Sequence, residues 1–136
     1  MLPKTILLAE DDADDRSFFL DFLIHRNDIS AISTVENGEE VFNFLETIYE
    51  ASQLPHIIIL DQNMPKRNGL QTLQMLKQNS VYKKIPVFMY STYADENLAS
   101  QSLDCGATLV LAKPFSPDGY QQMMDAVFEA LQHNKS

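Results

Sequence analysis

Ile57-Ile58-Ile59-Leu60-Asp61 lies near the middle of the chain. Four consecutive apolar residues leave no polar face, which is typical of a parallel strand that helices cover on both sides. A strand of this kind needs parallel neighbours, and each parallel neighbour needs a crossover connection of a dozen or more residues. The stretch therefore predicts an α/β protein in which Asp61 follows a central buried strand.

Four further apolar runs flank this strand at intervals of roughly 25 residues, the length of a strand and a returning helix. The five predicted strands are residues 6–9, 29–35, 57–60, 87–90 and 108–112. Amphipathic segments separate them, and the last, after Pro117, repeats apolar residues from Tyr120 to Leu131. Asn37-Gly38 could form a hairpin turn, but the amphipathic run behind it favours a helix start. The alternation predicts a doubly wound (βα)5 fold around a five-stranded parallel sheet.

The composition is that of one ordinary globular domain, with 136 residues, 45% hydrophobic and 21% charged. Nineteen acidic residues against ten basic ones give a formal charge of −9, which repels nucleic acid and anionic lipid. The single cysteine, Cys105, cannot form an internal disulfide, and no targeting segment or membrane span is visible. We expect one domain over residues 1–136 without an output domain, in the cytoplasm, with neither nucleic acid nor membrane as partner.

The polar residues that follow the first, third, fourth and fifth predicted strands are candidates for a site. They are Glu10, Asp11 and Asp12 after the first strand, Asp61 and Asn63 after the third, Ser91 and Thr92 after the fourth, and Lys113 after the fifth. Ligands of doubly wound sheets bind beyond the carboxyl ends of the strands, where these residues would converge. Taken singly, each has an ordinary explanation as a helix cap, a turn residue or a solvated strand end. Capping explains neither the lysine nor the spacing between Asp61 and Gly69, so the set favours a site.

The chemistry of this set points to phosphoryl transfer. Neighbouring strands lie about 4.8 Å apart, so Glu10, Asp11 and Asp61 would bring their carboxylates into one pocket, where they repel. A divalent cation removes the conflict, and ligands that are all oxygen suit Mg²⁺. Asp61 would then be the nucleophile that forms an acyl phosphate, while Ser91 and Lys113 hold the phosphoryl oxygens.

Along nearly its whole length the chain resembles the receiver domain of two-component response regulators, the CheY-like family. The resemblance rests on residues 6–12, 57–65, Gly69, Ser91 and 113–115. It implies the flavodoxin-like strand order 2-1-3-4-5.

The same resemblance implies a role for each site residue. Asp61 becomes the phosphoacceptor, Ser91 fills the Thr/Ser switch position, and Lys113 is the lysine of the site. The metal ligands it implies for Mg²⁺ are Glu10, Asp11, Asp61 and the backbone carbonyl of Asn63. The bond between Lys113 and Pro114 is often cis in the family, which would aim the lysine inward.

The resemblance also implies partners. The phosphoryl donor would be a sensor histidine kinase or a histidine phosphotransfer protein, and the only catalysis would be the protein's own phosphorylation and dephosphorylation. Glu10-Asp11 and the long connections 47–55 and 77–86 are similar to those of single-domain regulators that serve phytochrome-type sensor kinases. The expected output surface is formed by the fourth helix, fifth strand and fifth helix, for a downstream protein or a second copy of the chain.

Two positions depart from the family pattern. Asn68 stands where an acid is common, and Val110 replaces the usual aromatic residue of the fifth strand. Because Val110 is short and stiff, we expect the response to phosphorylation to be carried by the loop from Ser91 to Asp95, with Tyr90 or Tyr93 as the moving aromatic side chain.

Three other functions compete with this interpretation. A haloacid-dehalogenase-like phosphatase needs a second aspartate two residues after the nucleophile, where this chain has Asn63. A flavodoxin-type FMN carrier needs a phosphate loop after the first strand, where Glu10-Asp11-Asp12 would repel the phosphate. A degenerate receiver that only binds partners is disfavoured by the presence of Asp61, Ser91 and Lys113.

Overall fold

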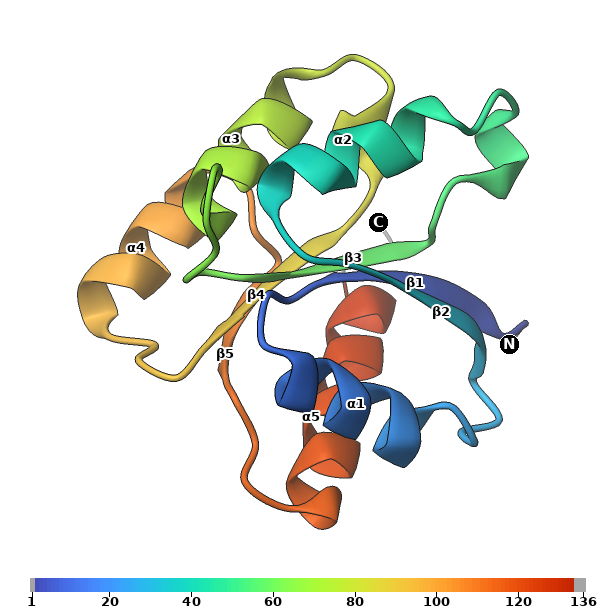
Figure 1. Cartoon of the computed structure of the whole chain (residues 1–136), viewed down its shortest axis with the longest axis vertical. Coiled ribbons are helices and arrows are strands. Elements are labelled where there is room, and N and C mark those ends of the chain that lie inside the picture. The colour runs from blue at the N-terminus through green and yellow to red at the C-terminus, as the bar shows by residue number, and fades with distance from the viewer. Residues whose placement is uncertain (1, 134–136) are drawn as a thin grey trace.

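The computed structural model describes residues 2–133, which form one parallel sheet flanked by helices (Figure 1). In chain order the elements are β1 (Lys4–Ala9), α1 (Ala13–Leu23), β2 (Ile29–Val35), α2 (Gly38–Glu46), the 3₁₀ turn η1 (Ala51–Gln53), β3 (Ile57–Asp61), α3 (Gly69–Gln78), the 3₁₀ turn η2 (Tyr82–Lys84), β4 (Val87–Ser91), α4 (Glu96–Asp104), β5 (Leu109–Ala112) and α5 (Pro117–His133). The strand order is β2-β1-β3-β4-β5, which confirms the predicted doubly wound fold.

Each face of the sheet packs on its own apolar core. Alternate residues of the segments 6–9 in β1 and 57–60 in β3 point to opposite faces, and all eight are at most 1% exposed. Ile6 and Ile59 belong to the core beneath α1 and α5, whereas Leu7 and Leu60 belong to the core beneath α2 and α3. Figure 1 shows α1 and α5 on one side of the sheet, and α2, α3 and α4 on the other. Burial on both faces explains why these two segments have no polar positions.

Side-chain caps fix the starts of four helices at the carboxyl ends of the strands. Asp12, Asn37 and Asp95 accept a hydrogen bond from the backbone of the first turn of α1, α2 and α4. Asn68 caps α3 through a reciprocal capping box with Gln71. The helix start predicted at Asn37-Gly38 is thereby confirmed. Asn68, which stands where an acid is common in the family, therefore stabilises the start of α3, because a cap of this kind contributes about 1 kcal/mol to stability.

The spacing between Asp61 and Gly69 has a structural reason, which is the close approach of the start of α3 to the end of β3. A Cβ atom at this position would lie 2.4 Å from the carbonyl oxygen of Asp61 and 2.7 Å from the Cε of Met89. The Gly69 N–H donates to the carbonyl of Gln62 at 3.1 Å. The start of α3 therefore lies directly against the end of β3, which only glycine permits.

Helical spacing predicts buried faces that include Phe18 in α1 and Ser102 with Leu103 in α4, and for Phe18 and Leu103 this prediction is wrong. Leu103 of α4 is 49% exposed, and its neighbour Ser102 is the fully buried residue of that helix. Phe18 of α1 is 45% exposed, and its ring stacks on that of Phe22. No helix within residues 2–133 is long and apolar enough to cross a bilayer.

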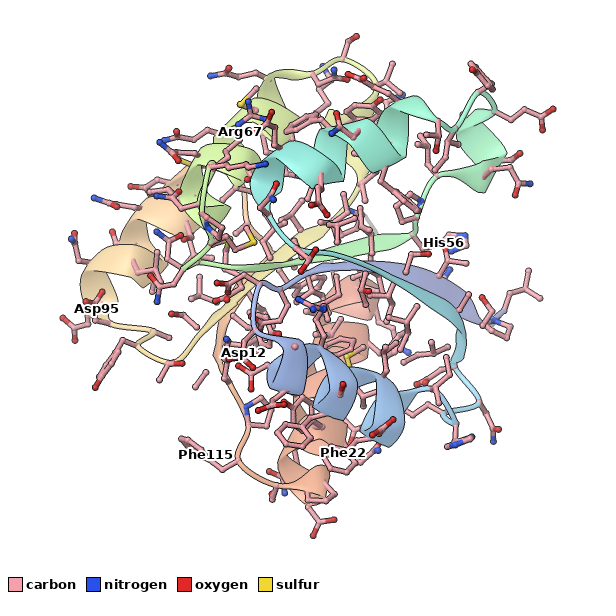
Figure 2. The ribbon with its side chains drawn as sticks, in the orientation of Figure 1. Asp12, Phe22, His56, Arg67, Asp95 and Phe115 are labelled. Atoms are coloured by element: carbon pink, nitrogen blue, oxygen red, sulfur yellow. The ribbon has the colours of Figure 1, made fainter. Side chains whose placement is uncertain are left out.

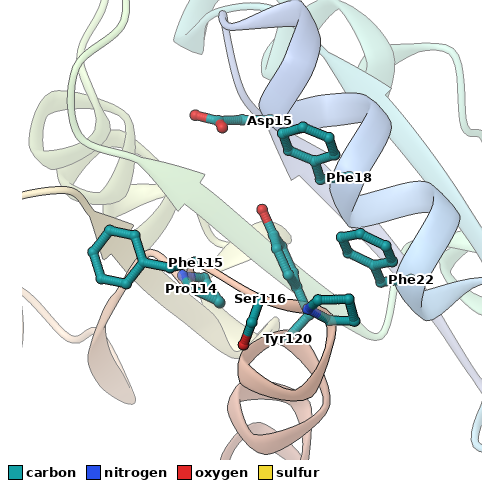
Figure 3. Close-up of a pocket in the computed structure, with 8 residues that line it drawn as sticks. Asp15, Phe18, Phe22, Pro114, Phe115, Ser116 and Tyr120 are labelled. Carbon is teal, nitrogen blue, oxygen red and sulfur yellow. The ribbon is translucent and has the colours of Figure 1, made fainter.

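Figure 2 shows the two ends of the parallel strands. Asp12, Asp95 and Phe115 lie on the side of the carboxyl ends, whereas His56 lies on the opposite side, where β3 begins. On the side of the carboxyl ends, a groove separates α1 from the start of α5 (Figure 3). It is lined by Asp15, Phe18, Phe22, Pro114, Phe115, Ser116, Pro117 and Tyr120. The Phe115 side chain at its edge is 96% exposed.

Candidate functional site

The backbone of the sheet brings the candidate residues together. The N–H of Glu10 donates to the Val35 carbonyl at 2.9 Å, and the N–H of Lys113 donates to the Ser91 carbonyl at 3.0 Å. Both residues therefore continue the strand ladders by one position. Asp61 is the last residue of β3, next to β1. The carboxyl ends of β1, β3 and β5 thus deliver Glu10, Asp61 and Lys113 to the same edge of the sheet.

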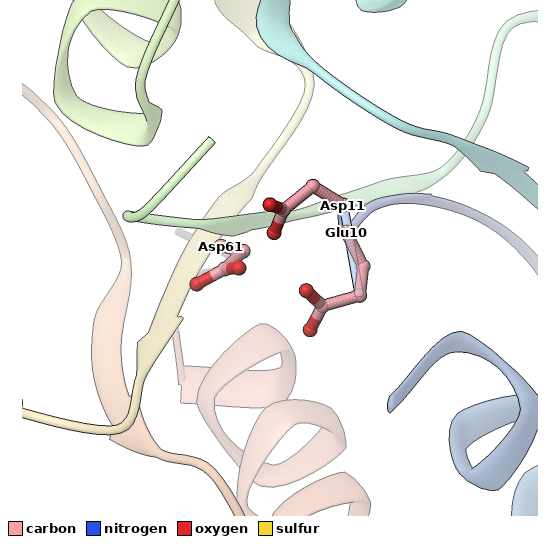
Figure 4. A group of neighbouring side chains, drawn as sticks. All are labelled: Glu10, Asp11 and Asp61. Carbon is pink, nitrogen blue, oxygen red and sulfur yellow. The ribbon is translucent and has the colours of Figure 1, made fainter. Parts of the chain in front are cut away.

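An acidic cluster forms at this edge (Figure 4). Glu10, Asp11 and Asp61 each offer a carboxylate oxygen, and these atoms all lie within 4.8 Å of one another. Glu10 and Asp61 are buried, at 0% and 2% exposure, whereas Asp11 is exposed to solvent. Oxygen donors at one open edge fit a hard divalent cation that keeps several waters. The cluster predicted from the sequence is therefore present, with a donor set suited to Mg²⁺ or Mn²⁺.

Lys113 lies at the centre of three carboxylates. Its Nζ is 2.8 Å from Glu10 Oε1, 3.0 Å from Asp15 Oδ2 and 3.3 Å from Asp61 Oδ2. An ammonium group has three N–H donors, so these contacts use its full capacity. The Lys113 side chain is 13% exposed, and Glu10 and Asp61 raise its pKa although burial opposes them. The lysine therefore remains charged next to the acidic cluster.

The two buried carboxyl groups have opposite pKa shifts. Burial would raise the pKa of Glu10, but its hydrogen bonds with Asp61, Lys113, Tyr90 and the Asp12 N–H lower it. Burial, with the hydrogen bond and charge of Glu10, raises the pKa of Asp61 to about 7. Near neutral pH, Asp61 is thus partly protonated without a metal. Cation binding has to displace that proton.

Ser91 and Asn63 lie next to these residues with contacts of their own. Ser91 ends β4 and is buried, and its Oγ accepts a hydrogen bond from the Tyr93 N–H at 3.3 Å. The Asn63 N–H donates to Asp61 Oδ1 at 3.3 Å. The ion pairs of Lys113 join it to Glu10, Asp15 and Asp61, whereas Ser91 ends the neighbouring strand and contacts Lys113 through their backbones.

The expected cis bond between Lys113 and Pro114 is wrong, because no peptide bond among residues 2–133 is cis. The lysine nevertheless points inward. Its backbone continues the β5 ladder through the bond to Ser91, and three carboxylates attract its ammonium group. These two constraints suffice to direct the side chain without a cis bond.

Two residues of the site were not predicted from the sequence. The Tyr90 hydroxyl donates to Glu10 Oε1, and burial together with Glu10 raises its pKa, so it stays a donor. Asp15 contacts Lys113, although its place in the first turn of α1 is explained equally well by the helix dipole. The sequence feature that could have indicated Asp15 is its position one helical turn after Asp11 and Asp12, which places another acid beside the cluster.

Sequence comparison connects this geometry to known proteins. A family profile described as the response regulator receiver domain matches residues 6–125. The chain is 29% identical over 126 residues to a probable chemotaxis protein CheY of Rhizobium etli, covering 93% of each chain. It is 32% identical over 113 residues to the response regulator Rcp1 of Synechocystis, covering 82% of this chain and 77% of Rcp1. The match to the nitrate/nitrite response regulator NarL of Escherichia coli, by contrast, spans 50% of NarL.

Solved structures agree in fold. The phosphorylated cyanobacterial phytochrome response regulator RcpA has a TM-score of 0.79 at 27% identity, covering 93% of this chain and 92% of RcpA. The Mn²⁺-bound form of Rcp1 has a TM-score of 0.78 at 28% identity, covering 98% and 97%. The resemblance inferred from the site motifs is confirmed.

Proposed function

Because this chain belongs to the response regulator receiver domain family of two-component systems, we propose that it accepts one phosphoryl group on Asp61 and signals through contacts with other proteins. The observation that carries the proposal is the placement of Asp61, which is 2% exposed and lies 3.3 Å from the ammonium of Lys113, inside a three-carboxylate cluster. A surface turn aspartate would need none of these neighbours.

The proposed reaction follows from the charges of the site. An Asp61 carboxylate oxygen attacks phosphorus, a P–O bond forms, and the P–N bond to the donor histidine breaks, with the imidazole leaving as a neutral ring once protonated. Mg²⁺, held by Glu10, Asp11, Asp61 and the Asn63 carbonyl, would neutralise the carboxylates and phosphoryl oxygens. Lys113 donates to a phosphoryl oxygen, and the Ser91 hydroxyl turns from Tyr93 to donate to another. Hydrolysis by water later returns Asp61 and inorganic phosphate.

The proposed donor is a phospho-histidine of a sensor kinase or a phosphotransfer protein. It would dock on the groove of Figure 3, whose exposed rings are Phe18 and Phe115 and whose rim carries Asp15, the contact of Lys113. Exposed aromatic side chains beside a reactive group favour a protein partner over a small substrate. Since RcpA is described as a phytochrome response regulator, we propose a phytochrome-type kinase as the donor.

For output we propose the face formed by α4, β5 and α5, bound by a target protein or a second copy. Val110 packs on the core beneath α2 and α3, and Tyr90 is fully buried with its hydroxyl on Glu10, so neither is free to move. Tyr93, 80% exposed, follows Ser91 and would move with its loop. Hydrogen exchange with a phosphoryl mimic should change most at residues 92–95. Changes confined to β5 would contradict this route.

Acetyl phosphate tests the proposed chemistry directly. Intact-mass spectrometry should detect one added phosphoryl group with Mg²⁺ and none in excess EDTA, because the unneutralised acids repel another anion. The Mg²⁺ concentration for half-maximal labelling should fall as pH rises from about 6 to about 8, since Asp61 loses its competing proton in that range. Labelling that persists in EDTA contradicts the proposal. No labelling with Mg²⁺ would identify a receiver that only binds partners.

A further inference from the structure

Asp15 is the one carboxylate around Lys113 that lies outside the proposed metal site. Its Oδ2 is 3.0 Å from the Lys113 Nζ, and its side chain is 32% exposed. The other two carboxylates, Glu10 and Asp61, belong to the cluster that can hold a cation. Asp15 therefore shares the ion-pair partner of Asp61, but it neither binds the proposed metal nor accepts the phosphoryl group.

We propose that Asp15 is a positioning residue that holds Lys113 for phosphoryl transfer, an inference that rests on the proposed function. A bound cation engages the oxygens of Glu10 and Asp61, and a phosphoryl group on Asp61 replaces the contact from its carboxylate. Asp15 is then the acceptor that stays in place for the ammonium. Lysine is a flexible chain that carries a point charge, so one fixed acceptor determines where its remaining N–H groups point.

The fold supplies Asp15 with a rigid base. It is the third residue of α1, and its backbone N–H donates to the capping carboxylate of Asp12 at 2.9 Å. The side chain of Asp15 takes no part in that cap. Replacing its carboxylate therefore leaves the hydrogen bond that caps α1 intact while removing the ion pair with Lys113.

Asp14 provides a matched control. It precedes Asp15 in the same first turn, it is exposed, and within residues 2–133 no ion pair joins it to a cation. Asp14→Asn and Asp15→Asn remove the same charge and the same favourable interaction with the helix dipole. A difference between the two variants reports the contact with Lys113.

The test measures the rate of labelling by acetyl phosphate at saturating Mg²⁺, in which the P–O bond to acetate breaks as the bond to Asp61 forms. Asp15→Asn should lower the maximal rate about tenfold, because the neutral amide oxygen that remains is a weaker acceptor for the ammonium than the carboxylate. The half-saturating acetyl phosphate concentration should change less than about twofold, and Asp14→Asn should stay within about twofold on both measures, as exposed charges do. Asp15→Glu should recover much of the rate.

A double-variant cycle shows whether Asp15 acts through the lysine. In a Lys113→Ala background, Asp15→Asn should have no effect beyond that of Asp14→Asn. Mg²⁺ affinity, followed by NMR titration, should be equal in Asp14→Asn and Asp15→Asn. Equal labelling rates in these two variants, or an Asp15→Asn effect that persists without Lys113, would overturn the inference. If the natural chain is not labelled at all, the proposed function fails; if Lys113→Ala labels normally, the role of Lys113 is wrong and this inference fails with it.

Discussion

Asp61→Asn should abolish labelling while leaving the fold intact. An amide of the same shape cannot form an acyl phosphate. Glu10 is the other buried carboxylate of the cluster that contacts Lys113, but its oxygens already accept hydrogen bonds from Tyr90 and the Asp12 N–H. The measurement is intact-mass spectrometry after incubation with acetyl phosphate and Mg²⁺. Undiminished labelling of this variant would show that the acceptor lies elsewhere.

The same substitution should raise stability in the absence of metal. The folded-state pKa of Asp61 is raised to about 7 from an ordinary value of 3.8, so its contribution to stability is full below pH 3.8 and is lost as pH rises through 7. Because asparagine carries no charge at any of these pH values, Asp61→Asn avoids this loss. Its free energy of unfolding should exceed that of the natural chain by about 1–3 kcal/mol at pH 8 and by less at pH 5. Asp21→Asn, at an exposed position of α1, is the matched control and should label as the natural chain does.

The fold was predictable because it depends on local patterns. The unbroken apolar run before Asp61 reports burial on both faces, which only a central parallel strand has. The helix starts were visible as capping residues such as Asn37. In contrast, Leu103 and Phe18 are exposed because a helix turned slightly on the sheet buries neighbouring positions instead, and apolar spacing alone does not set that rotation.

The site was predictable in part. Residues that end parallel strands converge through topology, so Glu10, Asp61 and Lys113 could be placed together. Asp15 and Tyr90 reach the site through the directions of their side chains, which depend on how α1 and β4 pack. The cis bond before Pro114 was expected from the family resemblance alone, and in this chain the bond is trans while three ion pairs direct the Lys113 side chain.

Lys113→Ala should slow labelling by about 100-fold, the usual cost of removing one charged donor from a transition state. It should also destabilise the metal-free protein by about 3 kcal/mol at pH 8, because two buried carboxyl groups lose their counter-charge. The loss should be smaller at pH 6, where Asp61 takes up a proton instead. Thermal denaturation at both pH values measures this, with Lys84→Ala, an exposed lysine of η2, as the control.

Lys113→Ala should raise the affinity for Mg²⁺ although it lowers the rate of labelling. In the metal-free protein the ammonium of Lys113 occupies oxygens of Glu10 and Asp61, the groups on which a cation also depends. Without the ammonium, Mg²⁺ is the only strong counter-charge left to them, so Lys113→Ala should bind Mg²⁺ more tightly and recover most of its lost stability when Mg²⁺ is added. Tighter metal binding combined with slower transfer separates a lysine that acts on the phosphoryl group from one that merely supports the fold. If Mg²⁺ affinity and labelling fall together, Lys113 serves to build the metal site, and its proposed contact with the phosphoryl oxygens is wrong.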